Sequence, residues 1–283
     1  MGPKDTIYEL LVTDYGLRKE AFMRILFIGD VVGEPGRRAI KTLLPKLKKS
    51  ERLDFVIANA ENVAGGSGVT PSMADELLDA GVDVLTSGDH IWKKKEIFDY
   101  IAVSKRLIRP ANYPQGAPGM GSTVVKSETG ISVGVINLIG RVFMQSLECP
   151  FKAAKAEIDR IKDKARVIIV DMHAEATSEK IALGWYLDGE VSAIVGSHTH
   201  VQTADEKILP QGTAFISDAG MTGPFDGVIG RKKEQILQRF LTSLPTKFEM
   251  AEGDIQLHGV VIDIDDKTGK ADSIKRIQKK LDA

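Results

Sequence analysis

Seven short apolar runs, each bounded by glycine, aspartate, asparagine or serine, constrain the fold of this chain more than any other feature. Runs of this kind are typical of β-strands buried on both faces. Helical patterns separate several of them, and such alternation predicts a layered α/β fold. The predicted strands are residues 25–28, 55–58, 82–86, 133–138, 167–170, 193–195 and 214–216. The clearest predicted helices are residues 37–49 and 71–80, and residues 151–164 and 232–243 are two others.

Two predicted hairpins indicate that the strands are not all parallel. Residues 256–264 and 270–277 flank a turn at 265–269 that is rich in aspartate and ends in glycine. Residues 121–126 and 131–138 are joined by a short polar segment that also ends in glycine. Because tight turns of this composition connect antiparallel strands, the sequence predicts mixed sheets.

The strand pattern begins abruptly at Met23. We therefore expect residues 1–22 to be an N-terminal extension or a cloning remnant, the alternative being a short surface helix over residues 7–21. Residues 23–283 are expected to form the functional domain, with room for a small cap built from inserted loops. A chain of 283 residues is long enough for one large domain of this type.

Composition narrows the class of partner and the compartment. The net charge is −1, so no overall basic surface points to nucleic acid, which we do not favour as a partner. Cys149 is the only cysteine, which excludes an internal disulfide and fits a reducing compartment. No apolar run is long enough to span a membrane, and residues 1–22 do not resemble a signal peptide. We expect a cytoplasmic protein without membrane contact.

Polar side chains follow five of the predicted strands at the point where each strand ends. In open α/β sheets, ligands bind beyond these carboxyl ends. Four of the five histidines lie there, and only His258 does not, so we expect His258 to be structural or exposed. The strand ends carry Asp30, Glu61, Asn62, Asp89, His90, His173, Glu175, His198 and His200.

Taken alone, an aspartate or a histidine after a strand is more often a cap or turn residue. His198 and His200 are more informative, because residues two apart in extended chain point to the same side. Five such strand ends together predict a metal site. Nitrogen and oxygen ligands without thiolate favour manganese, iron or zinc. The ligands are too many for one tetrahedral ion, which predicts two ions about 3.5–4 Å apart, bridged by a carboxylate.

Six motifs resemble those of the calcineurin-like metallophosphoesterases, and specifically the bacterial YmdB family. The resemblance runs from Met23 nearly to the C-terminus. It implies a four-layer β-sandwich with mixed sheets flanked by helices, in place of a single doubly wound sheet. The motifs are residues 28–33, Ala60-Glu61-Asn62, Gly88-Asp89-His90, Met172-His173-Ala174-Glu175, residues 196–201 and residues 218–224.

The resemblance also implies a role for each candidate residue. Asp30, Asn62 and His200 would hold one metal ion. Asp89, His173 and His198 would hold the other, and Glu61 would bridge the two ions. His90 would stand beside the site without binding metal. The expected metals are iron or manganese, with zinc as the alternative.

One motif departs from the family pattern. The third motif usually reads Gly-Asn-His, and here it reads Gly88-Asp89-His90. Aspartate keeps an oxygen ligand and adds a negative charge, so we expect Asp89 to bind metal still. The added charge should lower the net charge of the metal cluster and raise the pKa of its bound water.

The resemblance implies a metal-dependent phosphodiesterase of small nucleotides, with 2′,3′-cyclic nucleotides favoured. Hydroxide held between the metals would attack phosphorus, and His90 would protonate the leaving oxygen as general acid. An alternative role for His90 is to orient Asp89. Glu175 would orient a ligand histidine, while Asn112 and the loop 220–230 are candidate substrate contacts.

Three other functions stay open at this stage. The first is a metal-dependent nuclease using the basic runs 93–95 and 231–233. The second is a regulatory protein that binds a nucleotide or a partner at a silent metal site, and the third is an amidohydrolase. For the phosphodiesterase we expect a homo-oligomer acting on a small substrate.

Overall fold

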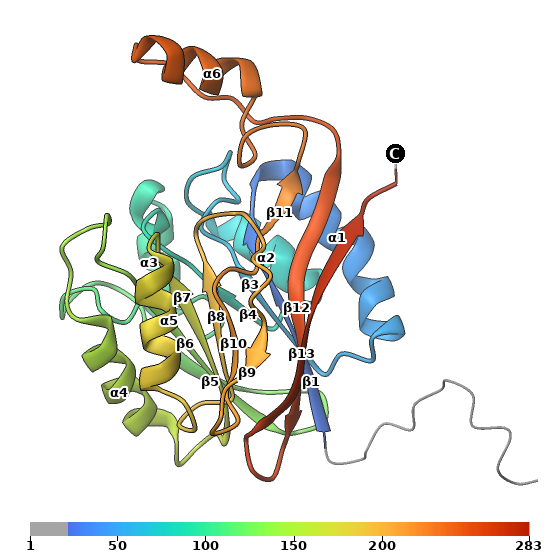
Figure 1. The fold of residues 1–283 in the computed structure, drawn as a ribbon, viewed down its shortest axis with the longest axis vertical. Helices are drawn as coiled ribbons and strands as arrows, with labels where there is room; N and C mark the ends of the chain where they lie inside the picture. The colour runs from blue at the N-terminus through green and yellow to red at the C-terminus, as the bar shows by residue number, and fades with distance from the viewer. Residues whose placement is uncertain (1–21, 283) are drawn as a thin grey trace, which may run out of the picture.

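The computed structural model describes residues 22–282, whose strands form two mixed sheets (Figure 1). The first sheet has the order β2-β11-β12-β1-β3-β4, with β13 paired to β12. The second has the order β5-β6-β7-β8-β10-β9. The strands of the first sheet are β1 (Phe22–Ile28), β2 (Asp30–Val31), β3 (Phe55–Asn59), β4 (Val84–Thr86), β11 (Met221–Pro224), β12 (Ile255–Asp265) and β13 (Ala271–Lys280). Those of the second are β5 (Ser122–Lys126), β6 (Ser132–Ile139), β7 (Val167–His173), β8 (Ala193–Ser197), β9 (Lys207–Ile208) and β10 (Ala214–Ile216).

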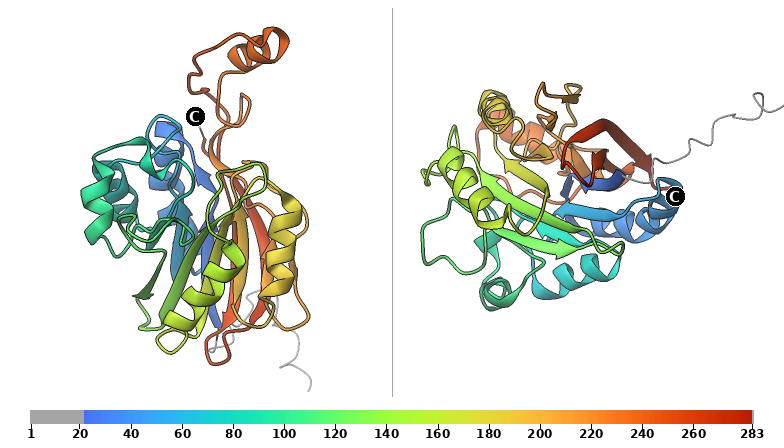
Figure 2. Two further views of the ribbon diagram at one scale, coloured as in Figure 1. Left: turned by 90° about the vertical axis from the view of Figure 1, so that its left-hand side faces the viewer. Right: turned by 90° about the horizontal axis from the view of Figure 1, so that it is seen from below.

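Helices cover the outer faces of both sheets (Figure 2). They are α1 (Gly33–Ser50), α2 (Pro71–Asp79), α3 (Ile97–Val103), α4 (Pro150–Ile161), α5 (Thr177–Tyr186) and α6 (Lys233–Thr242), with a short 3-10 turn, η1 (Ile91–Lys93). Side chains of α1, α2 and α3 pack on the first sheet, and those of α4 and α5 pack on the second. Helix α6 stands away from both sheets, at the top of Figure 1.

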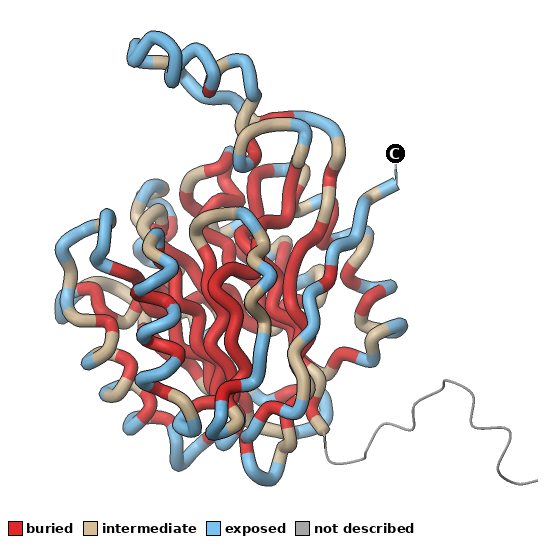
Figure 3. The backbone as a smooth tube through the Cα atoms, viewed as in Figure 1, coloured by how far each residue is buried: buried red, intermediate tan, exposed pale blue. Residues whose placement is uncertain are grey.

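The alternation of side chains along β1 shows how the layers are built. Leu26 and Ile28 face the helices, whereas Ile25 and Phe27 belong to the core between the two sheets. Side chains two apart on a strand share a face, so a fully apolar strand is buried on both sides. Figure 3 shows the resulting buried centre. The predicted four-layer sandwich with mixed sheets is therefore confirmed.

All seven predicted strands and both predicted hairpins are present. Strand β12 pairs antiparallel with β13, and β5 with β6. Helix α2 begins as predicted, with Pro71 in its first turn and the Thr70 hydroxyl accepting from the Met73 backbone. Helices α3 and α5 were not predicted. The predicted helix over residues 7–21 lies outside the described residues, and the boundary at Met23 and the cap stay predictions.

Parallel neighbours end side by side at one edge of the sandwich. Strand β1 pairs with β3, β3 pairs with β4, and β7 pairs with β8, each in parallel register. Their carboxyl ends therefore lie together, and the polar residues that follow them converge. Among residues 22–282, no helix is both long and apolar enough to cross a membrane.

Candidate metal centre and active site

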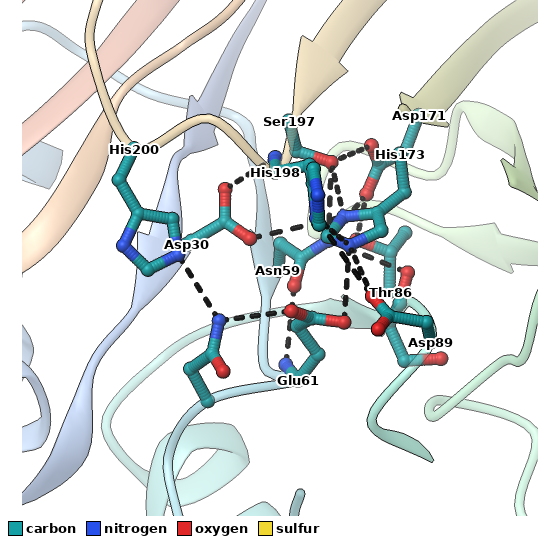
Figure 4. Close-up of polar contacts among 12 residues, drawn as sticks. Asp30, Asn59, Glu61, Thr86, Asp89, Asp171, His173, Ser197, His198 and His200 are labelled. Carbon is teal, nitrogen blue, oxygen red and sulfur yellow. Dashed lines mark hydrogen bonds and ion pairs between the residues drawn. The ribbon is translucent and has the colours of Figure 1, made fainter. Parts of the chain in front are cut away.

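Four predicted ligands converge on one point between the two sheets (Figure 4). They are Glu61 after β3, Asp89 after β4, His173 at the end of β7 and His198 after β8, and their ligand atoms all lie within 4.8 Å of one another. The Nε2 atom of His173 is 3.0 Å from a Glu61 carboxylate oxygen and 3.3 Å from one of Asp89. It is also 3.0 Å from Nδ1 of His198.

The other three predicted ligands lie against this group. The side-chain amide nitrogen of Asn62 is 2.9 Å from Glu61 Oε1 and 3.2 Å from His200 Nε2. The His198 backbone N–H donates to Asp30 Oδ2 at 3.0 Å. Rotation of the Asn62 side-chain amide by half a turn would place its oxygen, the atom that binds a cation, where its nitrogen now points.

The packing at the site fits a bound cation. Oδ1 of Asp30 is buried and accepts no hydrogen bond. A Cβ atom on Gly88 would lie 2.2 Å from Glu61 Oε2 and 2.3 Å from His173 Nε2, so only glycine allows β4 to approach these groups. All donors are nitrogen or oxygen. This donor set suits divalent ions such as manganese, iron or zinc.

Burial governs the protonation of these groups. It raises the pKa of the Asp30 carboxyl well above its usual range, and the neighbouring His173 imidazole offsets only part of this. Burial also lowers the pKa of His200 to about 4, which keeps the imidazole neutral as a ligand must be. For Glu61 burial raises the pKa, but the neighbouring His173 and His90 imidazoles together outweigh burial and leave the pKa well below its usual range. A cation at this point would stabilise the ionised carboxylates.

A buried polar network behind His173 fixes its ring. Ser197 Oγ lies 2.9 Å from His173 Nδ1 and donates to Asp171 Oδ1 at 2.6 Å. The Asn59 amide donates to the other Asp171 oxygen at 3.0 Å. Burial raises the pKa of Asp171. No role was predicted for these residues from the sequence, although a polar side chain inside an apolar strand is a usable signal.

The loop that follows β8 does not have the extended conformation we expected. His198 has φ 100° and His200 has φ 65°, in the left-handed region that side chains rarely adopt. Our reason for placing both imidazoles on one side, the two-residue repeat of an extended chain, is therefore wrong. Strained conformations of this kind persist only where the surroundings hold them.

A buried ion pair holds this loop. Lys180 on α5 donates to Asp218 Oδ2 at 2.8 Å, and both residues are buried. The same oxygen accepts from the Thr199 backbone at 3.0 Å and from its hydroxyl at 2.7 Å. The other Asp218 oxygen accepts from the Gly220 N–H at 2.9 Å. Gly220 in turn accepts from the Asp30 N–H at 3.0 Å. One carboxylate thus links ligand-bearing loops of both sheets.

His90 and Glu175 lie beside the ligands. His90 Nδ1 is 3.0 Å from Asn62 Oδ1, and its Nε2 is 3.6 Å from Asp89 Oδ2. His90 is not among the four converging ligands. Glu175 lies 3.2 Å from His198 Nε2, in position to orient that ring.

Asn112 and His258 both lie in structural positions. The Asn112 side chain is buried and bonds to the backbone of Ile139 and Glu148, so it does not reach a substrate. His258 is buried in β12 against the Phe225 ring, and burial lowers its pKa to about 4. Of the two expectations for His258, structural or exposed, the structure agrees with the structural one.

The converging ligands open onto two hollows. One, of about 310 Å³, is lined by Glu61, Asn62, Gly66, His90, Glu175, His198, Thr199, His200, Ile229 and Arg231. The other, of about 410 Å³, is lined by Asp89, Phe143, Met144, Gln145 and His198. A substrate reaching the ligands therefore has space on two sides.

Comparison with known proteins agrees with this arrangement. A family model described as YmdB-like protein matches residues 26–277. The chain belongs to the YmdB-like family. A Bacillus subtilis relative, named 2′,3′-cyclic-nucleotide 2′-phosphodiesterase, is 54% identical over 255 residues, which cover 90% of this chain and 96% of the relative.

Two solved structures resemble this YmdB-like chain closely. One is a hypothetical protein from Thermus thermophilus, with a TM-score of 0.86 and 41% identity, covering 92% of this chain and 100% of that one. The other, from Mycoplasma pneumoniae, is described as a novel phosphatase, with a TM-score of 0.86 and 36% identity, covering 92% of this chain and 94% of that one. The predicted family is thus confirmed.

Proposed function

We propose that this protein is a metal-dependent phosphodiesterase that hydrolyses small phosphodiesters, with 2′,3′-cyclic nucleotides as the favoured substrates. The observation that carries the proposal is the convergence of two carboxylates and two imidazoles at the mouth of a hollow. The name of the Bacillus subtilis relative supports the choice of substrate.

Each ligand has a proposed place. Asp30, Asn62 and His200 would hold one ion, and Asp89, His173 and His198 would hold the other. Glu61, whose two oxygens contact His173 and Asn62, would bind both ions. Iron or manganese is the proposed metal, with zinc as the alternative. Two such ions neutralise phosphate oxygens and make water a stronger nucleophile at neutral pH.

His90 supplies the proton for the leaving oxygen. Its ring is half-buried and lines the same hollow as Glu61 and His200. A hydrogen bond with Glu61 raises the pKa of His90, which favours the protonated ring near neutral pH. A raised pKa suits a general acid, which must hold a proton before it can donate one.

Arg231 gives the hollow a positive charge. Its guanidinium donates to the carbonyl oxygens of Gly65 and Gly66 at 3.1 and 2.6 Å. None of the ion pairs within residues 22–282 involves Arg231. Because a half-buried guanidinium without a carboxylate partner favours an anion, Arg231 binds a phosphate oxygen of the substrate.

The test is hydrolysis of 2′,3′-cyclic AMP by metal-free protein reconstituted with manganese, iron or zinc. We expect turnover that depends on the metal and is lost in His200→Ala. Stoichiometric metal binding without turnover of this substrate or of bis(p-nitrophenyl) phosphate would refute the proposal and favour the regulatory binding protein.

The departure at Asp89 gives a second test. Asp89→Asn keeps an oxygen ligand and removes one negative charge, so we expect full metal stoichiometry and a pH–rate profile whose acid limb moves to lower pH. Asp89→Ala, which removes the ligand atom, is the control and should lose metal. If Asp89→Asn loses metal as Asp89→Ala does, the carboxylate itself is required.

Two of the three basic residues in the run 231–233 already have carboxylate partners. Lys232 pairs with Glu249 at 2.7 Å, and Lys233 pairs with Asp226 at 2.6 Å. Binding of a nucleic acid backbone by these two ammonium groups would have to replace both ion pairs. The cytoplasmic location and the homo-oligomer stay predictions.

A further inference from the structure

Phe143 has a position that neither packing nor backbone preference explains. Its side chain is 89% exposed, and its backbone has φ 61°. A large aromatic side chain exposed to this degree contributes almost nothing to the core. The left-handed conformation costs a non-glycine residue of this size about 1–2 kcal/mol. An unfavourable residue in an unfavourable conformation points to a role in function.

The turn that carries Phe143 is tied to the metal centre. Gly140, at its start, donates its N–H to the backbone oxygen of His173 at 2.9 Å. The N–H groups of Arg141 and Val142 then donate to the buried Glu179 carboxylate at 3.1 and 3.3 Å. Phe143 is thus displayed on a short, well-anchored turn directly beside a ligand strand.

The hollow beside this turn reaches the ligands. It is lined by Phe143, Met144 and Gln145 of the turn and by Asp89 and His198 of the metal centre. A group that occupied it would extend from the metal centre to the face of an aromatic ring. Apart from Asp89 and His198, which belong to the metal centre, its lining holds no charged or titratable group.

We propose that this hollow is a nucleobase subsite and that the base of the substrate stacks on Phe143. The proposal rests on the proposed phosphodiesterase function, which places the phosphate at the ligands of both sheets. A nucleoside cyclic phosphate bound there must put its base a few ångströms away. Stacking on an aromatic ring is worth about 1–3 kcal/mol per base and accepts every base, with preference following stacking strength. The subsite therefore favours purines over pyrimidines and does not select one base absolutely.

The test compares two substrates that share the reacting ring. These are 2′,3′-cyclic AMP and glycerol 1,2-cyclic phosphate, which has the same five-membered cyclic phosphate and no base. For Phe143→Ala we expect kcat/KM to fall about 10-fold on the nucleotide, from the stacking energy above, and to stay within about twofold on the glycerol compound. Phe143→Trp should retain the wild-type values. An equal loss on both substrates, or no loss on either, overturns the subsite.

Two further measurements separate stacking from other effects. Phe143→Gly suits the left-handed backbone, so it should unfold at or above the wild-type Tm and still lose kcat/KM on the nucleotide as Phe143→Ala does. In Phe143→Trp, the fluorescence added relative to wild type should be quenched by adenosine 3′-monophosphate and not by inorganic phosphate. Absence of quenching overturns the subsite, whether or not the protein turns over either substrate. Failure of the wild-type protein to turn over both substrates refutes the phosphodiesterase and leaves the quenching test of the subsite valid.

Discussion

Glu61→Gln is expected to lower kcat/KM for 2′,3′-cyclic AMP by more than about 100-fold, since even partners behind metal ligands are worth about 10–100-fold. It should also reduce the metal bound per chain. The carboxylate is buried and contacts both Asn62 and His173. Glutamine keeps the side-chain oxygen that accepts from Asn62 but loses the negative charge that two cations need between them.

The control is Glu175→Gln. Glu175 contacts His198 from the outside and is half exposed, so this variant should retain both metals and lose less than about 10-fold in kcat/KM. Metal content is read by elemental analysis and activity by initial rates. A Glu61→Gln protein with full metal and near-wild-type rates would remove Glu61 from the bridging position.

Breaking the Lys180–Asp218 pair should have the largest effect on stability. Lys180→Met leaves a buried, uncompensated carboxylate, which costs about 3–5 kcal/mol of unfolding free energy. Activity should also fall, because Asp218 holds Thr199 between two ligand histidines and Gly220 beside Asp30. Chemical denaturation and initial rates measure the two effects.

A double variant separates stability from positioning. Lys180→Met with Asp218→Leu replaces the ion pair by apolar groups, and such replacements are often neutral for stability. We expect its stability to recover toward wild type while its metal affinity and activity stay about 10–100-fold low, because the loss of the Asp218 carboxylate leaves Thr199 and Gly220 without their acceptor. If activity recovers together with stability, the Lys180–Asp218 pair contributes to the stability of the fold and does not position the candidate ligands. Lys155→Met, at an exposed ion pair with Glu190, is the control and should change neither.

The strands and the convergence of the candidate ligands were predictable from the sequence for the same reason. Apolar runs mark strands buried on both faces, and Asp30, Glu61 and His173 each stand at or just after the end of such a run. Parallel strands bring those ends to one edge. The spacing did not show how the strands divide into two sheets, because the order of strands along a chain does not fix which of them pair. That division came from the family resemblance.

Other features depend on contacts that no local pattern encodes. Helix α5 is short, contains Gly184 and ends in Trp185 and Tyr186, so its periodicity is weak. Lys180 within it looks like a solvent-facing helix residue until the fold closes over it. The left-handed backbone of His198 and His200 likewise depends on Asp218, a residue of another strand end.

The division of the ligands between two sheets bears on when the site is made. Asp30, Glu61, Asn62 and Asp89 follow strands of the first sheet, and every imidazole ligand comes with the second. A chain still being synthesised therefore offers oxygen and amide groups long before it offers a histidine ligand. Contacts between such distant segments form late in folding, because closing the long loops between them costs conformational entropy. The full set of candidate ligands is therefore complete only after the second sheet has formed.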